Sequence, residues 1–181
     1  MTDQKITIDY LLATVLAVIF TWVLHEFTHW ITAESLGYES IMRMNAVFPM
    51  EGQDPTDWHK IYISASGPII TILQAILVFF LLSKRWNRLL YPFLFVPLYM
   101  RALAGLMNFI NPNDEGRISQ FLGLGLFTLS ILVSAILFYF VYKITKQHNL
   151  KWRFNAVTTL IVMIASSILI LTDQFLKIQI L

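Results

Sequence analysis

Three ionisable residues stand in a segment that is otherwise almost wholly apolar. His25, Glu26 and His29 form the pattern His-Glu-Phe-Thr-His within the stretch 10–31. Histidines four residues apart project from one face of a helix, where two imidazole rings can share a metal ion. In hydrolytic zinc sites, the glutamate beside the first histidine takes a proton from the attacking water. The pattern therefore predicts His25 and His29 as zinc ligands and Glu26 as a general base.

The apolar surroundings strengthen this interpretation. A charged side chain at the centre of a membrane helix costs about 2.5–3.5 kcal/mol on insertion scales. The alternative is that His25 and His29 are packed histidines and that their spacing is accidental. It does not explain why three polar residues occur together in an apolar helix. The chain has no cysteine, so thiolate ligands and disulfides are excluded. A metal would need histidine and carboxylate ligands.

The composition indicates an integral membrane protein. Of 181 residues, 57% are hydrophobic and only 13% are charged. A spanning helix needs about 20 apolar residues, and we expect spans at 10–33, 61–83, 89–110, 121–142 and 154–172. The predicted fold is an all-α integral membrane bundle of about five transmembrane helices, a single domain over 1–181, with a short loop or hairpin between the first two. We expect a multi-pass protein of the cell membrane, in contact with the lipid bilayer. The net charge of +2 gives no argument for nucleic acid.

Alternation of five spans brings three polar segments to one side of the membrane. These segments are the end of the first span, the start of the second, and residues 108–116 after the third. Asp114 is the favoured third ligand, because it follows the third span in a Pro/Asn/Gly segment that we expect to leave helical geometry. Glu115 and His59 lie on the same side and are alternatives. A helix-capping role for Asp114 is another alternative.

Four further residues near this side are candidates for contact with a substrate. Gly67 and Pro68 permit close backbone approach and interrupt helical hydrogen bonding; packing of small residues is an alternative that is compatible with this role. Asn108 and Asn111 could bind an extended peptide backbone or cap the end of a helix.

Other charged residues follow the same alternation. Arg101 lies within the third span, and we expect it to lie some distance from the proposed metal. It would pair with Glu26 or Asp173, or reach the interface, without a catalytic role. Basic residues gather on the side opposite the histidines: Lys5, Lys84, Arg85, Arg88, Lys143, Lys146, Lys151 and Arg153. The positive-inside rule places that side in the cytoplasm.

The ordered set of motifs resembles the site-2 protease family of intramembrane zinc metalloproteases. That family has His-Glu-x-x-His in one span, Ser/Ala-Gly-Pro in the next, and Asn…Pro…Asp-Gly in a third. The matches are 25–29, 66–68, and Asn108…Pro112…Asp114, and they cover roughly residues 20–120. The resemblance implies a protease-like core at about 10–120, with additional helices at about 121–142 and 154–172.

The resemblance also implies an activity and residue roles. His25, His29 and Asp114 would hold Zn²⁺, and Glu26 would be the general base. Asn108 or Asn111 would hold the unfolded substrate strand. The substrate would be a membrane protein or membrane-anchored peptide, cut in or beside its transmembrane helix.

The chain also departs from the family. Glu115 follows Asp114 where glycine is usual, and the loop between Asn108 and Asp114 is short. Family members commonly keep the metal toward the cytoplasm, whereas the basic residues predict the opposite side. The segment Asp114-Glu115-Gly116 motivates one alternative, an inactive relative that acts as a regulatory or binding module. A different membrane metallohydrolase or a transporter is a further alternative, and the absence of other intramembrane carboxylates argues against a transporter.

Overall fold

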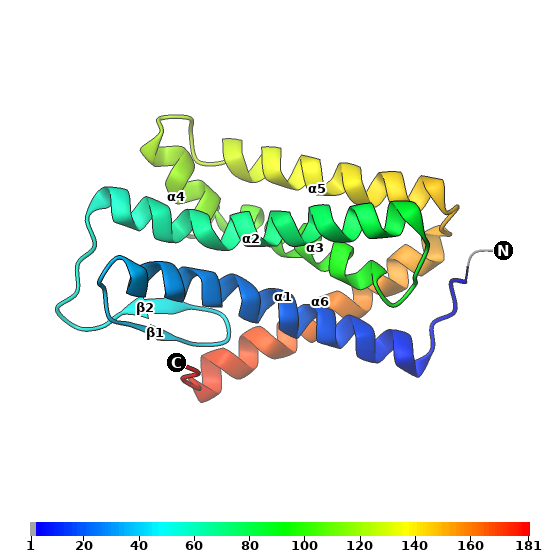
Figure 1. Cartoon of the computed structure of the whole chain (residues 1–181), viewed down its shortest axis with the longest axis horizontal. Coiled ribbons are helices and arrows are strands. Elements are labelled where there is room, and N and C mark those ends of the chain that lie inside the picture. The colour runs from blue at the N-terminus through cyan, green and yellow to red at the C-terminus, as the bar shows by residue number, and fades with distance from the viewer. Residues whose placement is uncertain (1–2) are drawn as a thin grey trace.

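The helices of this chain run back and forth along one long axis (Figure 1). The computed structural model describes residues 3–181. The helices are α1 (Ile8–Ser35), α2 (Asp57–Lys84), α3 (Tyr91–Met107), α4 (Asp114–Phe121), α5 (Thr128–Gln147) and α6 (Trp152–Leu176). A two-stranded antiparallel hairpin, β1 (Ser40–Met42) and β2 (Val47–Pro49), lies between α1 and α2. The predicted all-α bundle, with a hairpin between its first two long helices, is confirmed.

Among the described residues, four helices are long and apolar enough to cross a membrane: α1, α2, α5 and α6. The third predicted span corresponds to α3, a shorter apolar helix of 17 residues. The fourth was predicted at 121–142, but α5 begins only at Thr128. Gly123 and Gly125 have φ values of 70° and 84°, a left-handed geometry that interrupts the apolar run.

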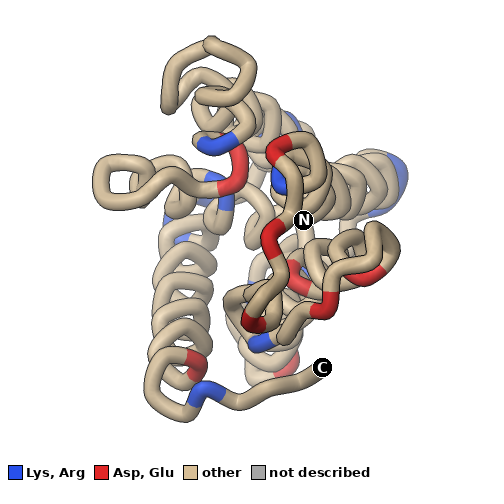
Figure 2. The backbone as a smooth tube through the Cα atoms, turned by 90° about the vertical axis from the view of Figure 1, so that its left-hand side faces the viewer, with Lys and Arg blue, Asp and Glu red and all other residues tan. Residues whose placement is uncertain are grey.

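The alternation of the helices separates two ends of the molecule. The hairpin, α4 and the last residues of the chain lie at one end, which we call the hairpin end (Figure 1). The first described residues and the α2–α3 and α5–α6 connections lie at the other, the N-terminal end. Figure 2 shows the hairpin end, where several acidic residues lie in or beside the loops. The predicted convergence of the three polar segments therefore occurs in the folded chain.

Apolar side chains fill the centre of the bundle and also cover its outside. Tyr10 and Val18 of α1 and Leu94 of α3 are fully buried, and the Tyr10 hydroxyl is hydrogen-bonded to Thr158 of α6 at 2.6 Å. Large apolar side chains are exposed on the outer helix faces, among them Leu12, Leu77, Phe80, Ile131 and Ile168. So much exposed apolar surface is typical of helices that face lipid.

The hairpin is fixed by contacts with the distant end of the chain. An Arg43 Nη2 donor lies 3.1 Å from Asp173 Oδ2, and the backbone N–H of Met44 donates to Asp173 Oδ1. Backbone hydrogen bonds join Met42 to Ile180 and Leu181. These contacts tie the hairpin to the end of α6 and to the residues after it, while Val47 and Phe48 of β2 lie beside Asn113 and Asp114.

Candidate metal centre

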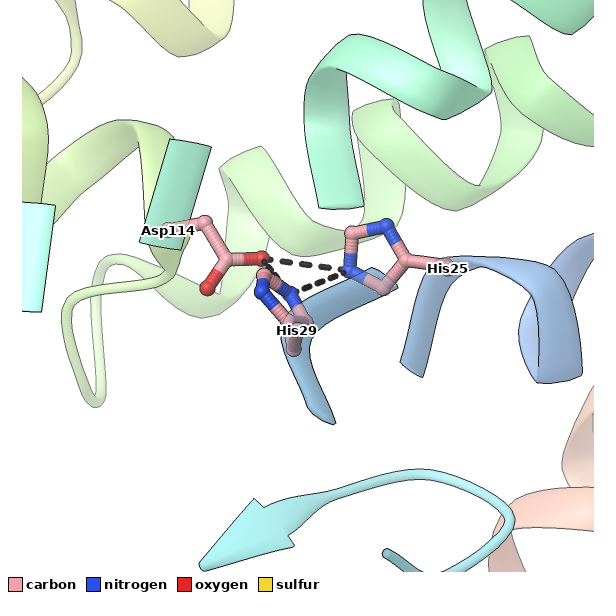
Figure 3. A group of neighbouring side chains, drawn as sticks. All are labelled: His25, His29 and Asp114. Carbon is pink, nitrogen blue, oxygen red and sulfur yellow. Dashed lines mark hydrogen bonds and ion pairs between the residues drawn. The ribbon is translucent and has the colours of Figure 1, made fainter. Parts of the chain in front are cut away.

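His25, His29 and Asp114 meet at the hairpin end of the bundle (Figure 3). The Nε2 atoms of the two histidines are 3.1 Å apart. Asp114 Oδ2 lies 3.2 Å from His25 Nε2 and 3.4 Å from His29 Nε2. One α1 turn and the first residue of α4 therefore direct three donor atoms at a common point.

This spacing fits a metal ion. Zinc binds histidine nitrogen and carboxylate oxygen at about 2.0–2.2 Å in tetrahedral sites, which sets neighbouring ligand atoms about 3.3 Å apart. The three observed distances of 3.1, 3.2 and 3.4 Å lie close to that separation. The residues present are nitrogen and oxygen donors, which zinc accepts along with other divalent metals.

Contacts from α2 orient both imidazole rings. His25 Nδ1 lies 3.2 Å from the Thr71 hydroxyl, and His29 Nδ1 donates to the Ile63 carbonyl at 2.6 Å. With Nδ1 of each ring engaged, Nε2 is the atom left to point at the common centre. Such outer contacts fix the tautomer and direction of a ligating histidine.

Gly67 makes room for the two rings. A Cβ atom added at this position would overlap both His25 and His29. Any side chain at position 67 would push the rings out of place or separate α1 from α2. Pro68 is also buried within α2. The structure thus places the Gly-Pro pair behind the histidines, and its predicted contact with substrate stays a prediction.

The position of Asp114 is fixed by the N-terminal capping of α4, of which it is the first residue. Asn113 is the N-cap of α4, and its Oδ1 accepts from the Gly116 backbone N–H at 2.6 Å. Asn108 Oδ1 accepts from the Asn113 backbone N–H, and Asn108 Nδ2 donates to the Ser130 hydroxyl. We expected Asp114 to lie in a non-helical segment, but only residues 108–113 leave helical geometry, because the Asn113 cap starts a helix at Asp114.

Charge also favours the ionised form of Asp114. Burial alone would raise the pKa of this carboxyl, but the hydrogen bonds with His25 and His29 outweigh burial and hold the pKa well below its usual range. The exposed Arg117 adds a contact of 2.6 Å between its Nη2 and Asp114 Oδ1. A carboxylate is the form that binds metal.

Arg101 Nη1 lies 3.7 Å from Asp114 Oδ2, but the closer partner of Arg101 is Glu115. Glu115 Oε1 accepts from Arg101 Nη1 at 3.1 Å, and both side chains are buried. Arg101 was expected to pair with Glu26 or Asp173, but Asp173 binds Arg43, and the Arg101 guanidinium reaches to 3.3 Å from His25 Nε2. Sequence reasoning placed Arg101 at some distance from the metal site. That was wrong, because α3 packs against α1 and the long Arg101 side chain reaches both His25 and Glu115.

Glu26 faces a small pocket beside the three donor atoms. The pocket has a volume of about 300 Å³ and is lined by residues of four segments: Glu26, His29, Asn45, Ala46, Val47, Phe48, Ile63, Ser64, Asn113, Asp114 and Arg117. We call it the Glu26 pocket. Within residues 3–181, the Glu26 carboxylate has no hydrogen-bond or ion-pair partner, although its residue is only 7% exposed. It is therefore available to a molecule that enters.

The remaining predicted residues lie outside the Glu26 pocket. Asn108 is buried beneath the α4 cap, and Asn111 is exposed on the connection to α4. His59 is hydrogen-bonded to the Tyr38 hydroxyl at 2.7 Å and is not part of the ligand group.

Asn113 and Arg117 line the pocket and were missed by sequence reasoning. The Nδ2 atom of Asn113 is buried without a partner among the described residues. The cap position just before Asp114 in Asn-Pro-Asn-Asp could have pointed to Asn113. For Arg117, only its position one helical turn after Asp114 hinted at the contact.

No protein-family model, curated protein or solved structure matches the chain.

Proposed function

We propose that this chain is a multi-pass protein of the cell membrane and an intramembrane zinc metalloprotease similar to the site-2 protease family. The observation that carries the proposal is the ligand group itself. An α1 His-Glu-x-x-His pair and Asp114 of α4 direct three donor atoms within 3.4 Å of one another, next to a pocket that Glu26 faces. Four apolar helices of spanning length support the membrane location.

Each residue then has a chemical task. When bound by His25, His29 and Asp114, zinc would supply Lewis acidity and lower the pKa of the attacking water to about 7. Glu26 accepts the proton of that water and returns it to the leaving amine. Burial of Glu26 without a partner keeps the carboxylate free for this transfer.

The substrate is a membrane-anchored peptide that enters as an extended strand. A helix keeps its carbonyls hydrogen-bonded, so the cleaved segment must unwind before it can react. Residues 45–48, including the start of β2, line one side of the Glu26 pocket, and the unpartnered Asn113 Nδ2 lies on another. An extended backbone between them could pair with β2 and accept a hydrogen bond from Asn113.

Replacement of Glu26 by Gln tests the proposal. The probe is a synthetic transmembrane peptide with a fluorophore and a quencher, reconstituted with the full chain in lipid vesicles. The wild type should bind about one zinc ion per chain, measured by inductively coupled plasma mass spectrometry, and cleave the peptide. Glu26→Gln should keep the zinc and lose about 10²–10⁴-fold in rate, the usual contribution of a general base.

The exposed Glu51→Gln change is the matched control and should leave zinc content and cleavage unchanged. Absence of zinc after purification without chelators would contradict the proposal, as would cleavage that survives Glu26→Gln.

A membrane-embedded binding module is the second candidate. It is favoured by two arginines beside the ligand atoms, Arg101 and Arg117, because nearby positive charge weakens binding of a cation. Under this alternative, the chain would bind membrane peptides without cutting them. Cleavage that depends on both Glu26 and Asp114 would eliminate it.

A further inference from the structure

A large cavity lies at the N-terminal end, far from the metal centre. It has a volume of about 830 Å³ and lies between the first described residues and the start of α6. Its lining residues are Asp3, Gln4, Lys5, Ile6, Asn149, Lys151, Arg153, Phe154 and Val157. We call it the basic cavity. The proposed proteolysis makes no use of it.

Three cations line the basic cavity. Lys5, Lys151 and Arg153 are exposed, and within residues 3–181 none of them lies within ion-pair distance of a carboxylate. The carboxylate in the lining, Asp3, is paired with Arg88 at 3.1 Å. The cavity therefore offers excess positive charge to an anion. Several convergent cationic donors suit a phosphate group, which accepts charge-assisted hydrogen bonds on several oxygens.

Hydrogen bonds hold the two sides of the cavity together. Gln4 Nε2 donates to the Asn149 carbonyl at 3.1 Å, and Gln4 Oε1 accepts from the Lys151 backbone N–H at 2.8 Å. On the other flank, Trp86 Nε1 donates to the Asp3 carbonyl, and Arg88 donates to the Lys5 carbonyl. These bonds fix the backbone from which the cations project.

Part of the lining is apolar. Ile6, Phe154 and Val157 contribute apolar side chains to the lining. Beyond Val157, α6 exposes Leu160 and Ile164 on its outer face. A ligand with a phosphate group and apolar chains would satisfy both parts at once. Free phosphate would leave the apolar part without a partner.

We propose that the basic cavity binds the phosphate headgroup of an anionic phospholipid, whose acyl chains lie along the exposed face of α6. Other basic residues at the same end, including Lys84, Lys143 and Lys146, would add attraction toward an anionic membrane surface without lining the cavity. The lipid headgroup and free phosphate both present anionic oxygens to the cations. The experiment below distinguishes these two ligands.

The test is native mass spectrometry of the full chain in detergent, titrated separately with phosphatidylglycerol, phosphatidylcholine and inorganic phosphate. The wild type should prefer phosphatidylglycerol. The triple variant Lys5→Gln/Lys151→Gln/Arg153→Gln should weaken phosphatidylglycerol binding by about 10- to 100-fold, because each cation near an anionic surface contributes about tenfold or less.

A matched triple variant removes the same charge from the same end outside the cavity: Lys84→Gln/Lys143→Gln/Lys146→Gln. It should keep the phosphatidylglycerol preference. The charge-conserving variant Lys5→Arg/Lys151→Arg/Arg153→Lys should also keep it, which separates loss of charge from damage to the fold.

Three outcomes would overturn the proposal. The first is equal binding of both lipids by the wild type. The second is an equal loss of binding in the cavity variant and the matched variant, which would indicate a diffuse surface effect. The third is binding of inorganic phosphate as tight as that of phosphatidylglycerol, which would exclude a role for the lipid chains.

Discussion

His25 Nε2 lies 3.2 Å from Asp114 Oδ2, although the two residues are 89 positions apart in the chain. The first residue of the pair is a buried residue in the second half of α1, and the second is the first residue of the short helix α4. Their contact therefore depends on the packing of α1, α2 and α4 together. Changes to that packing should be visible as changes in metal binding.

Replacement of Asp114 by Asn should remove most of the bound metal. The amide keeps the size of the side chain but loses the anionic oxygen that faces both histidines. Mutation of a residue that only supports a metal ligand typically lowers metal affinity by about 10–100-fold. Asp114 is a proposed ligand itself, so we expect its replacement to lower the affinity by at least about 100-fold. Competition with a zinc-sensitive chelating dye measures the affinity. Glu51→Gln serves as the control, and an unchanged affinity in Asp114→Asn would rule out Asp114 as a ligand.

Gly67→Ala should destabilise the fold and disturb the metal site together. The added methyl group overlaps the His25 and His29 rings, and overpacking of this kind costs about 1–3 kcal/mol. Gly105→Ala is the matched control, because its added Cβ would lie 3.4 Å from Ser130 Cβ without such overlap. Denaturant unfolding and zinc content should be compared for the two variants. Equal behaviour of both would refute the assigned role of Gly67.

Glu115→Gln should be strongly destabilising. The change removes the closer counter-ion of the buried Arg101 guanidinium and leaves Asp114 Oδ2, 3.7 Å away. Removal of one partner of a buried pair costs about 3–5 kcal/mol, and we expect a cost of at most that size. The double variant Arg101→Met/Glu115→Leu should recover much of the stability, because it removes both charges. Unfolding curves of the two variants measure the difference. A double variant less stable than the single one would contradict the pairing.

Asp173→Asn should loosen the hairpin. Asp173 accepts hydrogen bonds from Arg43 and from the Met44 backbone, and bonds to a charged group contribute about 1.5–3 kcal/mol. We therefore expect amide hydrogen exchange in residues 40–49 to accelerate by about 10- to 100-fold. Asp54→Asn, which breaks an exposed pair with Lys60, should leave this exchange unchanged. Faster exchange throughout α1 as well would mean global destabilisation instead.

Much of the site could be predicted because its information is local or follows from counting spans. The His25 and His29 spacing needs only helical periodicity. Asp114 followed from alternation, since the third span had to end on the side where the first one ended. Neither inference required knowledge of side-chain packing.

The rest depended on contacts that no local pattern encodes. Arg101 meets Glu115 and approaches His25 because α3 crosses beside α1, and hydropathy does not give that crossing angle. The role of Gly67 depends on which ring faces it across the α1–α2 interface. The apolar run at 121–127 was assigned to a span because hydropathy does not register the left-handed backbone at Gly123 and Gly125.

The anchoring of the hairpin by Asp173 has a consequence for the order of synthesis. Arg43 leaves the ribosome 130 residues before its partner. Strand β2, which lines the Glu26 pocket, is paired with β1. Until α6 has been made, this hairpin lacks its contacts with Asp173. The histidine pair is thus in place early, while the pocket in front of it takes its final shape among the last steps of folding.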